Sequence, residues 1–144
     1  MLESDIVAHC APTLAGIKTA NMFNYLPDDM EKLHQEIQEE NCKLNSKGVY
    51  VEILRTGEKR ALIYVYRKNR LEADLNRKGA ESILQTCGYE CGETDCCLRK
   101  LQERFFQYEC FPHEVGLFLG YPLDDVAGFI EQKGKNYKLS LIHI

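Results

Sequence analysis

The stretch that decides the fold is GVYVEILRTGEKRALIYVY, residues 48–66. Two runs of β-branched and aromatic residues, 48–54 and 60–66, are separated by turn-forming residues that include Gly57. Such runs are typical of strands, and a short polar connection containing glycine favours a hairpin between them. The sequence therefore predicts a central antiparallel β-hairpin, around which the rest of the chain packs.

Both faces of this hairpin are apolar. Because side chains alternate along a strand, one face carries small and β-branched side chains: Val49, Val51, Ile53, Ala61, Ile63 and Val65. The other face carries larger ones: Tyr50, Leu54, Leu62, Tyr64 and Tyr66. We expect helices to cover one face and a further strand or a partner to help cover the rest. The tyrosines could instead stack on a planar ligand.

Helical periodicity surrounds the hairpin. A first helix is expected to begin near Ser4, a suitable N-cap, and Pro12 interrupts it because proline cannot donate to the helix ladder. Residues 26–44 place four apolar side chains on one helical stripe: Met30, Leu33, Ile37 and Leu44. The pattern turns helical again from Asn69, and a further helix with Thr94 as its N-cap spaces three apolar residues along one side: Leu98, Leu101 and Phe105.

The C-terminal part of the chain predicts a short helical hairpin. Pro112 can occupy the first position of one helix, and Gly120 can end it. Pro122 can open the next helix, which Gly134 can end. The predicted fold class is therefore α+β: a small antiparallel sheet around the central β-hairpin, covered by several helices and ending in this helical hairpin.

Bulk properties indicate one soluble cytoplasmic domain. The 144 residues are 44% apolar and 28% charged, as is ordinary for a globular protein. A net charge of −4 without a block of Lys or Arg gives no electrostatic reason to bind nucleic acid or an anionic membrane. No apolar run approaches the roughly 18 residues of a membrane span, and the N-terminus lacks the features of a signal peptide. Seven cysteines, an odd number, favour reduced thiols over a disulfide framework.

Two unusual stretches carry a resemblance to a known family. They are HCAPTLAGIKTANMF, residues 9–23, and FPHEVGLFLGYPLDDVAGFIEQKGKNYKL, residues 111–139. Together they resemble the bacterial domain of unknown function 3793 family over nearly the whole chain. The resemblance implies a small bacterial cytoplasmic protein and assigns no catalytic residue.

The last six residues, LSLIHI at 139–144, depart from that family. They match the translation of a common transposase library adapter, whereas family members continue through a glycine–aromatic stretch and a helix. We therefore expect a single domain over residues 1–138 that is truncated at its C-terminus, followed by an adapter-derived tail. The missing residues are expected to include a strand that pairs with the hairpin. The alternative is a genuine apolar terminal strand.

The pair His113 and Glu114 stands in an apolar, glycine-containing run. It could be an acid/base site. Glu114 would otherwise lie in the first turn of a helix, where a carboxylate interacts favourably with the helix dipole, and His113 would be a surface or packing residue. Adjacent residues on a helix do not face each other, which favours the second interpretation.

A cysteine cluster is the candidate metal site. CGYECGETDCC, residues 87–97, contains Cys87, Cys91, Cys96 and Cys97, and four thiolates could hold zinc or an iron–sulfur cluster. The spacing matches no familiar two-knuckle pattern, and Cys97 shares a helical side with Leu101 and Phe105. Buried or incidental thiols are the alternative.

The N-terminal segment offers the other candidate sites. Cys10 could be a nucleophile if a histidine, either His9 or His113, accepted its proton. The same segment could instead bind a ligand or partner, because polar groups stand among small residues there: Thr13, Lys18, Thr19 and Asn21. Lys18 could attract a carboxylate or phosphate, although no P-loop pattern is present. Close packing of the segment is the alternative without a ligand.

Three function hypotheses follow. The first is a non-enzymatic binding or accessory protein, with an unknown small molecule or protein as its partner, at a site between residues 10–21 and His113 with Glu114. The second is a metal or redox protein that uses Cys87–Cys97, and the third is a thiol enzyme that uses Cys10.

Overall fold

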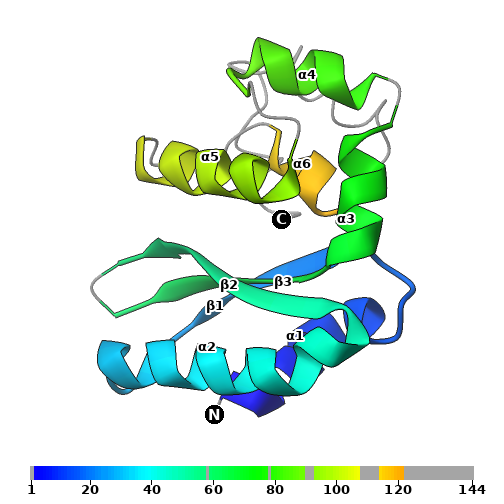
Figure 1. Ribbon diagram of the computed structural model, residues 1–144. Helices are drawn as coiled ribbons and strands as arrows, with labels where there is room; N and C mark the ends of the chain where they lie inside the picture. The colour runs from blue at the N-terminus through cyan, green and yellow to red at the C-terminus, as the bar shows by residue number, and fades with distance from the viewer. Residues whose placement is uncertain (1, 58, 78, 90–92, 108–113, 122–144) are drawn as a thin grey trace. The chain divides into compact units, whose positions relative to one another are not determined.

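The computed structural model describes most of the chain, namely residues 2–57, 59–77, 79–89, 93–107 and 114–121. Its elements follow one another in the order α1 (Leu2–Leu14), β1 (Ala20–Tyr25), α2 (Met30–Leu44), η1 (Asn45–Lys47), β2 (Val49–Thr56), β3 (Ala61–Arg67), α3 (Lys68–Leu75), α4 (Ala80–Thr86), α5 (Thr94–Gln107) and α6 (Val115–Phe118) (Figure 1). The chain groups into two compact units, Met1–Arg70 and Leu71–Ile144, which are described separately below. The prediction of a single domain stays a prediction.

The first unit is built on an antiparallel sheet in the order β1-β3-β2. β2 and β3 form the predicted hairpin, with Val51 opposite Val65, and a bulge interrupts their register between Ile53 and Arg55. β1 pairs with the other side of β3 and was not predicted as a strand. The α+β fold class and the central hairpin are confirmed.

One face of this sheet is covered by α1 and α2, which lie along it (Figure 1). The core between them consists of buried apolar side chains: Leu2, Ile6, Cys10, Phe23, Tyr25, Leu33, Val49, Val51, Ala61, Ile63 and Val65. The predicted stripe on α2 is confirmed, since Leu33 is buried and three partly buried residues pack against this core: Met30, Ile37 and Leu44. α2 follows the N-cap Asp29, whose side chain accepts a hydrogen bond from the N–H of Glu31 at 3.0 Å.

The first helix, α1, begins at Leu2 rather than near Ser4. The prediction of an N-cap at Ser4 is wrong because a carboxylate on another helix satisfies the helix start: the N–H of Leu2 donates to Glu36 Oε2 at 3.2 Å. The predicted interruption is confirmed. Pro12 lies inside α1, and the backbone leaves helical geometry at Cys10, with φ −118° and ψ 20°.

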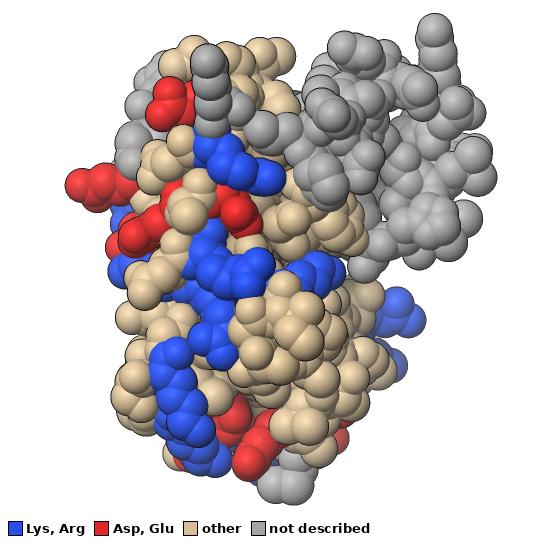
Figure 2. All heavy atoms as spheres, turned by 90° about the vertical axis from the view of Figure 1, so that its right-hand side faces the viewer, with Lys and Arg blue, Asp and Glu red and all other residues tan. Residues whose placement is uncertain are grey.

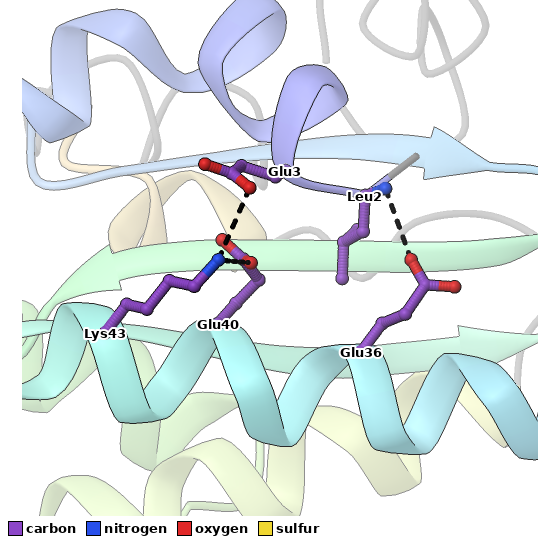
Figure 3. Close-up of polar contacts among 5 residues, drawn as sticks. All are labelled: Leu2, Glu3, Glu36, Glu40 and Lys43. Atoms are coloured by element: carbon purple, nitrogen blue, oxygen red, sulfur yellow. Dashed lines mark hydrogen bonds and ion pairs between the residues drawn. The ribbon is translucent and has the colours of Figure 1, made fainter.

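Polar contacts tie the two helices together above the core (Figure 3). Lys43 of α2 bridges Glu3 of α1 at 3.3 Å and Glu40 on its own helix at 3.4 Å. Glu36 also accepts a hydrogen bond from the hydroxyl of Tyr25 on β1, at 3.2 Å. These contacts connect α1, α2 and β1 at one end of the sheet.

The second unit is helical in its described residues. α5 begins at Thr94 as predicted, and its three predicted apolar residues are all buried: Leu98, Leu101 and Phe105. α6 lies within the first helix of the predicted helical hairpin, but it spans only Val115–Phe118. The second helix of that hairpin, from Pro122 to Gly134, falls outside the described residues.

Candidate functional site

The predicted site residues of the first unit come together where α1 ends and β1 begins. Thr13 is fully buried, and its hydroxyl donates a hydrogen bond to Asn21 Oδ1 at 2.7 Å. Arg67, at the end of β3, donates from Nε to the carbonyl of Thr13 and from Nη2 to the carbonyl of Leu14, both at 2.7 Å. A guanidinium on the last carbonyls of a helix satisfies acceptors that have no partner within the helix. The segment is therefore held firmly by its own chain.

The Cys10 thiol and the Lys18 amine interact electrostatically in this segment. Burial raises the pKa of the Cys10 thiol to about 12, although the nearby Lys18 opposes the shift. Burial lowers the pKa of the Lys18 amine, and Cys10 opposes that shift in turn. At neutral pH the thiol stays protonated, and a protonated thiol is a poor nucleophile.

His9, the neighbour of Cys10 in the chain, is engaged elsewhere. Its side chain is exposed, and its ring stacks on the ring of Phe23 with 5.0 Å between centroids and 15° between planes. The second candidate base, His113, lies outside the described residues. Among the described residues, no hydrogen bond joins Cys10 to a histidine, as a base for a Cys10 nucleophile would require.

Basic side chains gather on the side of the molecule where β3 runs into α3 (Figure 2). Two arginines from this part of the chain bind backbone carbonyls. Arg67 holds the end of α1, as described above, and Arg70 donates from Nη1 to the carbonyl of Gly16. Gly16 has φ +80°, a left-handed conformation that glycine adopts without strain. These two guanidiniums therefore fix the turn between α1 and β1.

The three tyrosines stack on one another. Tyr64 and Tyr66 lie 4.9 Å apart by ring centroid, and Tyr50 and Tyr66 lie 5.7 Å apart. Tyr64 and Tyr66 are buried, and the hydroxyl of Tyr66 donates to Glu52 at 3.2 Å. This burial indicates that the tyrosine face of the sheet is covered and is not an open stacking platform for a planar ligand.

Glu114, in the second unit, is fully buried and immediately precedes α6. Glu114 is the N-cap of that helix, but its side chain makes no capping hydrogen bond to it. The carboxylate instead accepts a hydrogen bond from the Tyr89 hydroxyl at 2.8 Å and pairs with the guanidinium of Arg104. Burial, with Glu114 beside it, raises the pKa of Tyr89. A buried carboxylate needs such partners, and here they come from α5 and from Tyr89, three residues after the end of α4.

The cysteine cluster is only partly described. Cys97 is buried, as its place beside Leu101 predicted, whereas Cys87 and Cys96 are half-exposed. Cys91 lies outside the described residues. Within the described part of the chain, no group of three His, Cys, Asp or Glu side chains is arranged to hold a metal ion.

The feature that sequence reasoning missed is the outer edge of β1. Arg67 N–H donates to the Thr19 carbonyl, and hydrogen-bonded pairs alternate along an antiparallel ladder. Asn21, Phe23 and Tyr25 therefore bond β3, while the backbone groups of Met22 and Asn24 point away from it. Among the described residues, no hydrogen bond reaches those outward groups. Two asparagines in the six residues of this strand weakened its propensity signal.

The opposite edge of the sheet is closed. The side chain of Asn41 on α2 donates to the carbonyl of Val51 at 2.9 Å and accepts from its N–H at 2.8 Å. The bulge between Ile53 and Arg55 also disturbs that edge. Bulges, charges and covering groups are common protections of edge strands. The two edges therefore differ, and among the described residues the β1 edge is the one that nothing pairs with.

The fold and these contacts define an α+β protein in whose first unit one strand edge, that of β1, has no pairing partner among the described residues. The chain belongs to the family described as protein of unknown function (DUF3793), whose model matches residues 6–142. No curated protein and no solved structure shows a significant match to it. Among the described residues, no helix has both the length and the apolar character that crossing a bilayer requires.

Proposed function

We propose that this chain is a non-enzymatic binding or accessory protein that binds a polypeptide partner along β1. The binding surface, which we name the β1 edge, consists of the outward backbone groups of Met22 and Asn24 with the flanking side chains of Ile17 and Leu26. A partner segment in extended conformation would add one strand to the sheet and exchange backbone hydrogen bonds with this edge.

The observation that carries the proposal is the difference between the two sheet edges. β2 has Asn41 on its backbone and a bulge in its register, whereas β1 has neither among the described residues. Ile17, three residues before β1, and Leu26, directly after it, are 76% and 66% exposed. Large apolar side chains beside an unpaired edge favour association with another chain.

Several observations support a role without catalysis. The raised pKa of Cys10 leaves its thiol protonated near neutral pH, and Glu114 is occupied by Tyr89 and Arg104. The finer expectations belong to the same proposal: a bacterial, cytoplasmic protein that binds neither nucleic acid nor membrane. The net charge of −4 and the use of Arg67 to bind carbonyls support the expectation that it binds neither nucleic acid nor membrane.

We also propose, as a second candidate, that the segment from Cys10 to Asn21 binds a small molecule. Lys18 is half-buried and its pKa is lowered by burial, so an anionic group bound beside it would favour the charged amine and stabilise the fold. A thermal-shift screen against carboxylates and inorganic phosphate tests this role. A stabilising anion whose effect disappears in Lys18→Ala, but not in the exposed Lys32→Ala, would support it.

The test of the main proposal selects extended peptides from a random-peptide library on the immobilised chain. Two variants of one position make the matched comparison. Asn24→Pro removes the outward N–H donor, while Asn24→Ala removes the same side chain and keeps that donor. We expect selected peptides to bind the native chain and Asn24→Ala equally, and to bind Asn24→Pro at least about tenfold more weakly, the equivalent of one lost hydrogen bond.

Hydrogen exchange provides the site-specific readout. A bound peptide should slow exchange of the Met22 and Asn24 amides and leave the inward Phe23 amide unchanged, because only the outward groups gain partners. The proposal fails if no peptide is selected and no second chain binds, or if binding is indifferent to the proline at Asn24.

A further inference from the structure

We infer that the partner at the β1 edge is β1 of a second copy of this chain, paired antiparallel about Phe23. The inference rests on the function proposed above and names the partner. Its basis is the charge pattern around the strand. Residues 19–27, TANMFNYLP, carry no charge, while Lys18 precedes them and Asp28 follows them. β1 itself, Ala20–Tyr25, is thus a neutral strand with a positive charge two residues before it and a negative charge three residues after it, a pattern that is complementary to its own reverse.

The outward groups restrict the register of such a pair. Two residues exchange hydrogen bonds across the new junction only if the backbone groups of both point outward. Met22 must therefore lie opposite either Met22 or Asn24 of the second copy, and the same holds for Asn24. Placing Met22 opposite Asn24 of the second copy centres the two-fold axis on Phe23. Extended two and three residues beyond the ends of β1, the same register sets Lys18 opposite Asp28 of the second copy, twice over by symmetry.

Alternative arrangements are less favourable. A parallel pair in register sets Lys18 against Lys18 and Asp28 against Asp28 of the second copy, and like charges directly opposite each other are destabilising. An antiparallel pair centred on Met22 sets Lys18 opposite Leu26, which leaves the charge without a counterpart. Only centring on Phe23 places both charged ends opposite an unlike charge.

The other edge of the sheet explains why the assembly should stop at two copies. Pairing the two β1 edges gives a continuous six-stranded sheet with β2 of each copy outermost. Asn41 covers Val51 on that strand, and the bulge between Ile53 and Arg55 distorts it. A closed two-fold dimer is therefore expected, rather than an open chain of copies.

A charge-reversal cycle tests the inference by sedimentation equilibrium of the full chain. The native chain should form a dimer of twice 16.6 kDa in a concentration-dependent manner. Asp28→Lys sets two like-charged pairs across the junction and should raise the dimer Kd about tenfold. Lys18→Glu should do the same, and the double variant Lys18→Glu/Asp28→Lys should restore the native Kd.

Two controls keep the cycle interpretable. Glu39→Lys changes the net charge by the same amount as Asp28→Lys at an exposed position of α2, and it should leave the dimer Kd unchanged. Asp28 is itself exposed, so Asp28→Lys should fold even if substitution of the half-buried Lys18 does not. Circular dichroism of each variant confirms folding before sedimentation.

Disulfide trapping reports the register directly. Paired residues in a hydrogen-bonded antiparallel pair have Cα atoms about 5.5 Å apart, within reach of a disulfide. Met22→Cys mixed with Asn24→Cys should give a cross-link between positions 22 and 24, identified by peptide mass spectrometry against the native cysteines. Met22→Cys alone should give none at that position.

The outcomes separate this inference from the proposed function. A chain that stays monomeric at every concentration, yet binds library peptides at the β1 edge, overturns the dimer and leaves the proposed function standing. A cross-link from Met22→Cys to itself overturns the register. A monomer that also selects no peptide overturns both. A dimer that follows the charge cycle and forms the 22–24 cross-link supports both.

Discussion

Asn41 of α2 and Val51 of β2 form a two-way hydrogen bond in which the amide side chain takes the place of a neighbouring strand. The amide donates to the Val51 carbonyl at 2.9 Å and accepts from the Val51 N–H at 2.8 Å. One helix side chain thereby satisfies both outward backbone groups of a strand residue that is only 1% exposed. This contact makes the two edges of the sheet unequal.

Asn41→Ala should destabilise the chain because it leaves the Val51 N–H and carbonyl without partners. The expected loss is about 1–3 kcal/mol in the free energy of unfolding, of which the higher helix propensity of alanine offsets about 0.5 kcal/mol. Urea denaturation followed by circular dichroism measures it. Gln38→Ala, an exposed amide on the same helix, should change stability by less than about 0.5 kcal/mol. Equal effects from the two substitutions would show that the Val51 contact contributes nothing.

Glu114→Gln should destabilise the second unit more than a surface substitution does. It leaves the guanidinium of Arg104, whose side chain is 15% exposed, without the fully buried carboxylate that balances its charge. Breaking such a pair from one side costs about 3 kcal/mol, and chemical denaturation measures the loss. The matched control is Glu103→Gln, because Glu103 is 59% exposed and lies 3.9 Å from Lys100. An exposed pair contributes less than about 1 kcal/mol, so similar losses would contradict a structural role for Glu114.

Cys10 should be the slow thiol of the first unit. Its pKa of about 12 means that it stays protonated at pH 8–9, and its burial keeps the reagent away, whereas Cys42 is exposed to the reagent. Timed alkylation followed by peptide mass spectrometry should therefore label Cys42 first and Cys10 only after unfolding. Rapid labelling of Cys10 in the folded chain would revive the thiol-enzyme hypothesis.

The same shift has a consequence for stability. Because folding raises the pKa of Cys10, the folded state favours the protonated thiol. The resulting stabilisation is complete below the ordinary thiol pKa of about 9 and is lost as the pH rises from there through about 12. Cys10→Ala should flatten the dependence of the free energy of unfolding on pH in this alkaline range. An unchanged slope would show that folding does not raise the pKa of Cys10.

Cys96→Ser and Cys97→Ser distinguish packing from metal binding in the second unit. Cys97 is 4% exposed, so a serine hydroxyl there should cost about 1–3 kcal/mol, whereas Cys96, which is half-exposed, should tolerate serine. Denaturation and elemental analysis of the purified chain give both readouts. Stoichiometric zinc or iron that both substitutions remove would favour the metal or redox hypothesis instead.

Much of the fold could be predicted from local pattern. The hairpin of β2 and β3, the apolar stripe of α2 and the buried side of α5 all follow from periodicities within one short segment, and the structure confirms each. Local pattern also drew attention to Thr13 and Asn21, which the fold joins by a hydrogen bond. It did not reveal the partners of Glu114, because they stand 10 and 25 residues away in the sequence.

The sequence by itself determined which segments are helices and which form the hairpin. These states depend on the spacing of apolar residues over a few helical turns, or on their alternation along a strand. Only the tertiary structure decided that residues 20–25 form a strand, because their state depends on pairing with β3, with Tyr25 opposite Ala61. It also decided which edge of the sheet is closed, because Asn41 and Val51 meet only when α2 packs on the sheet. Whether a strand edge is covered depends on contacts between segments that are distant in the sequence, and the spacing of residues within one segment does not predict such contacts.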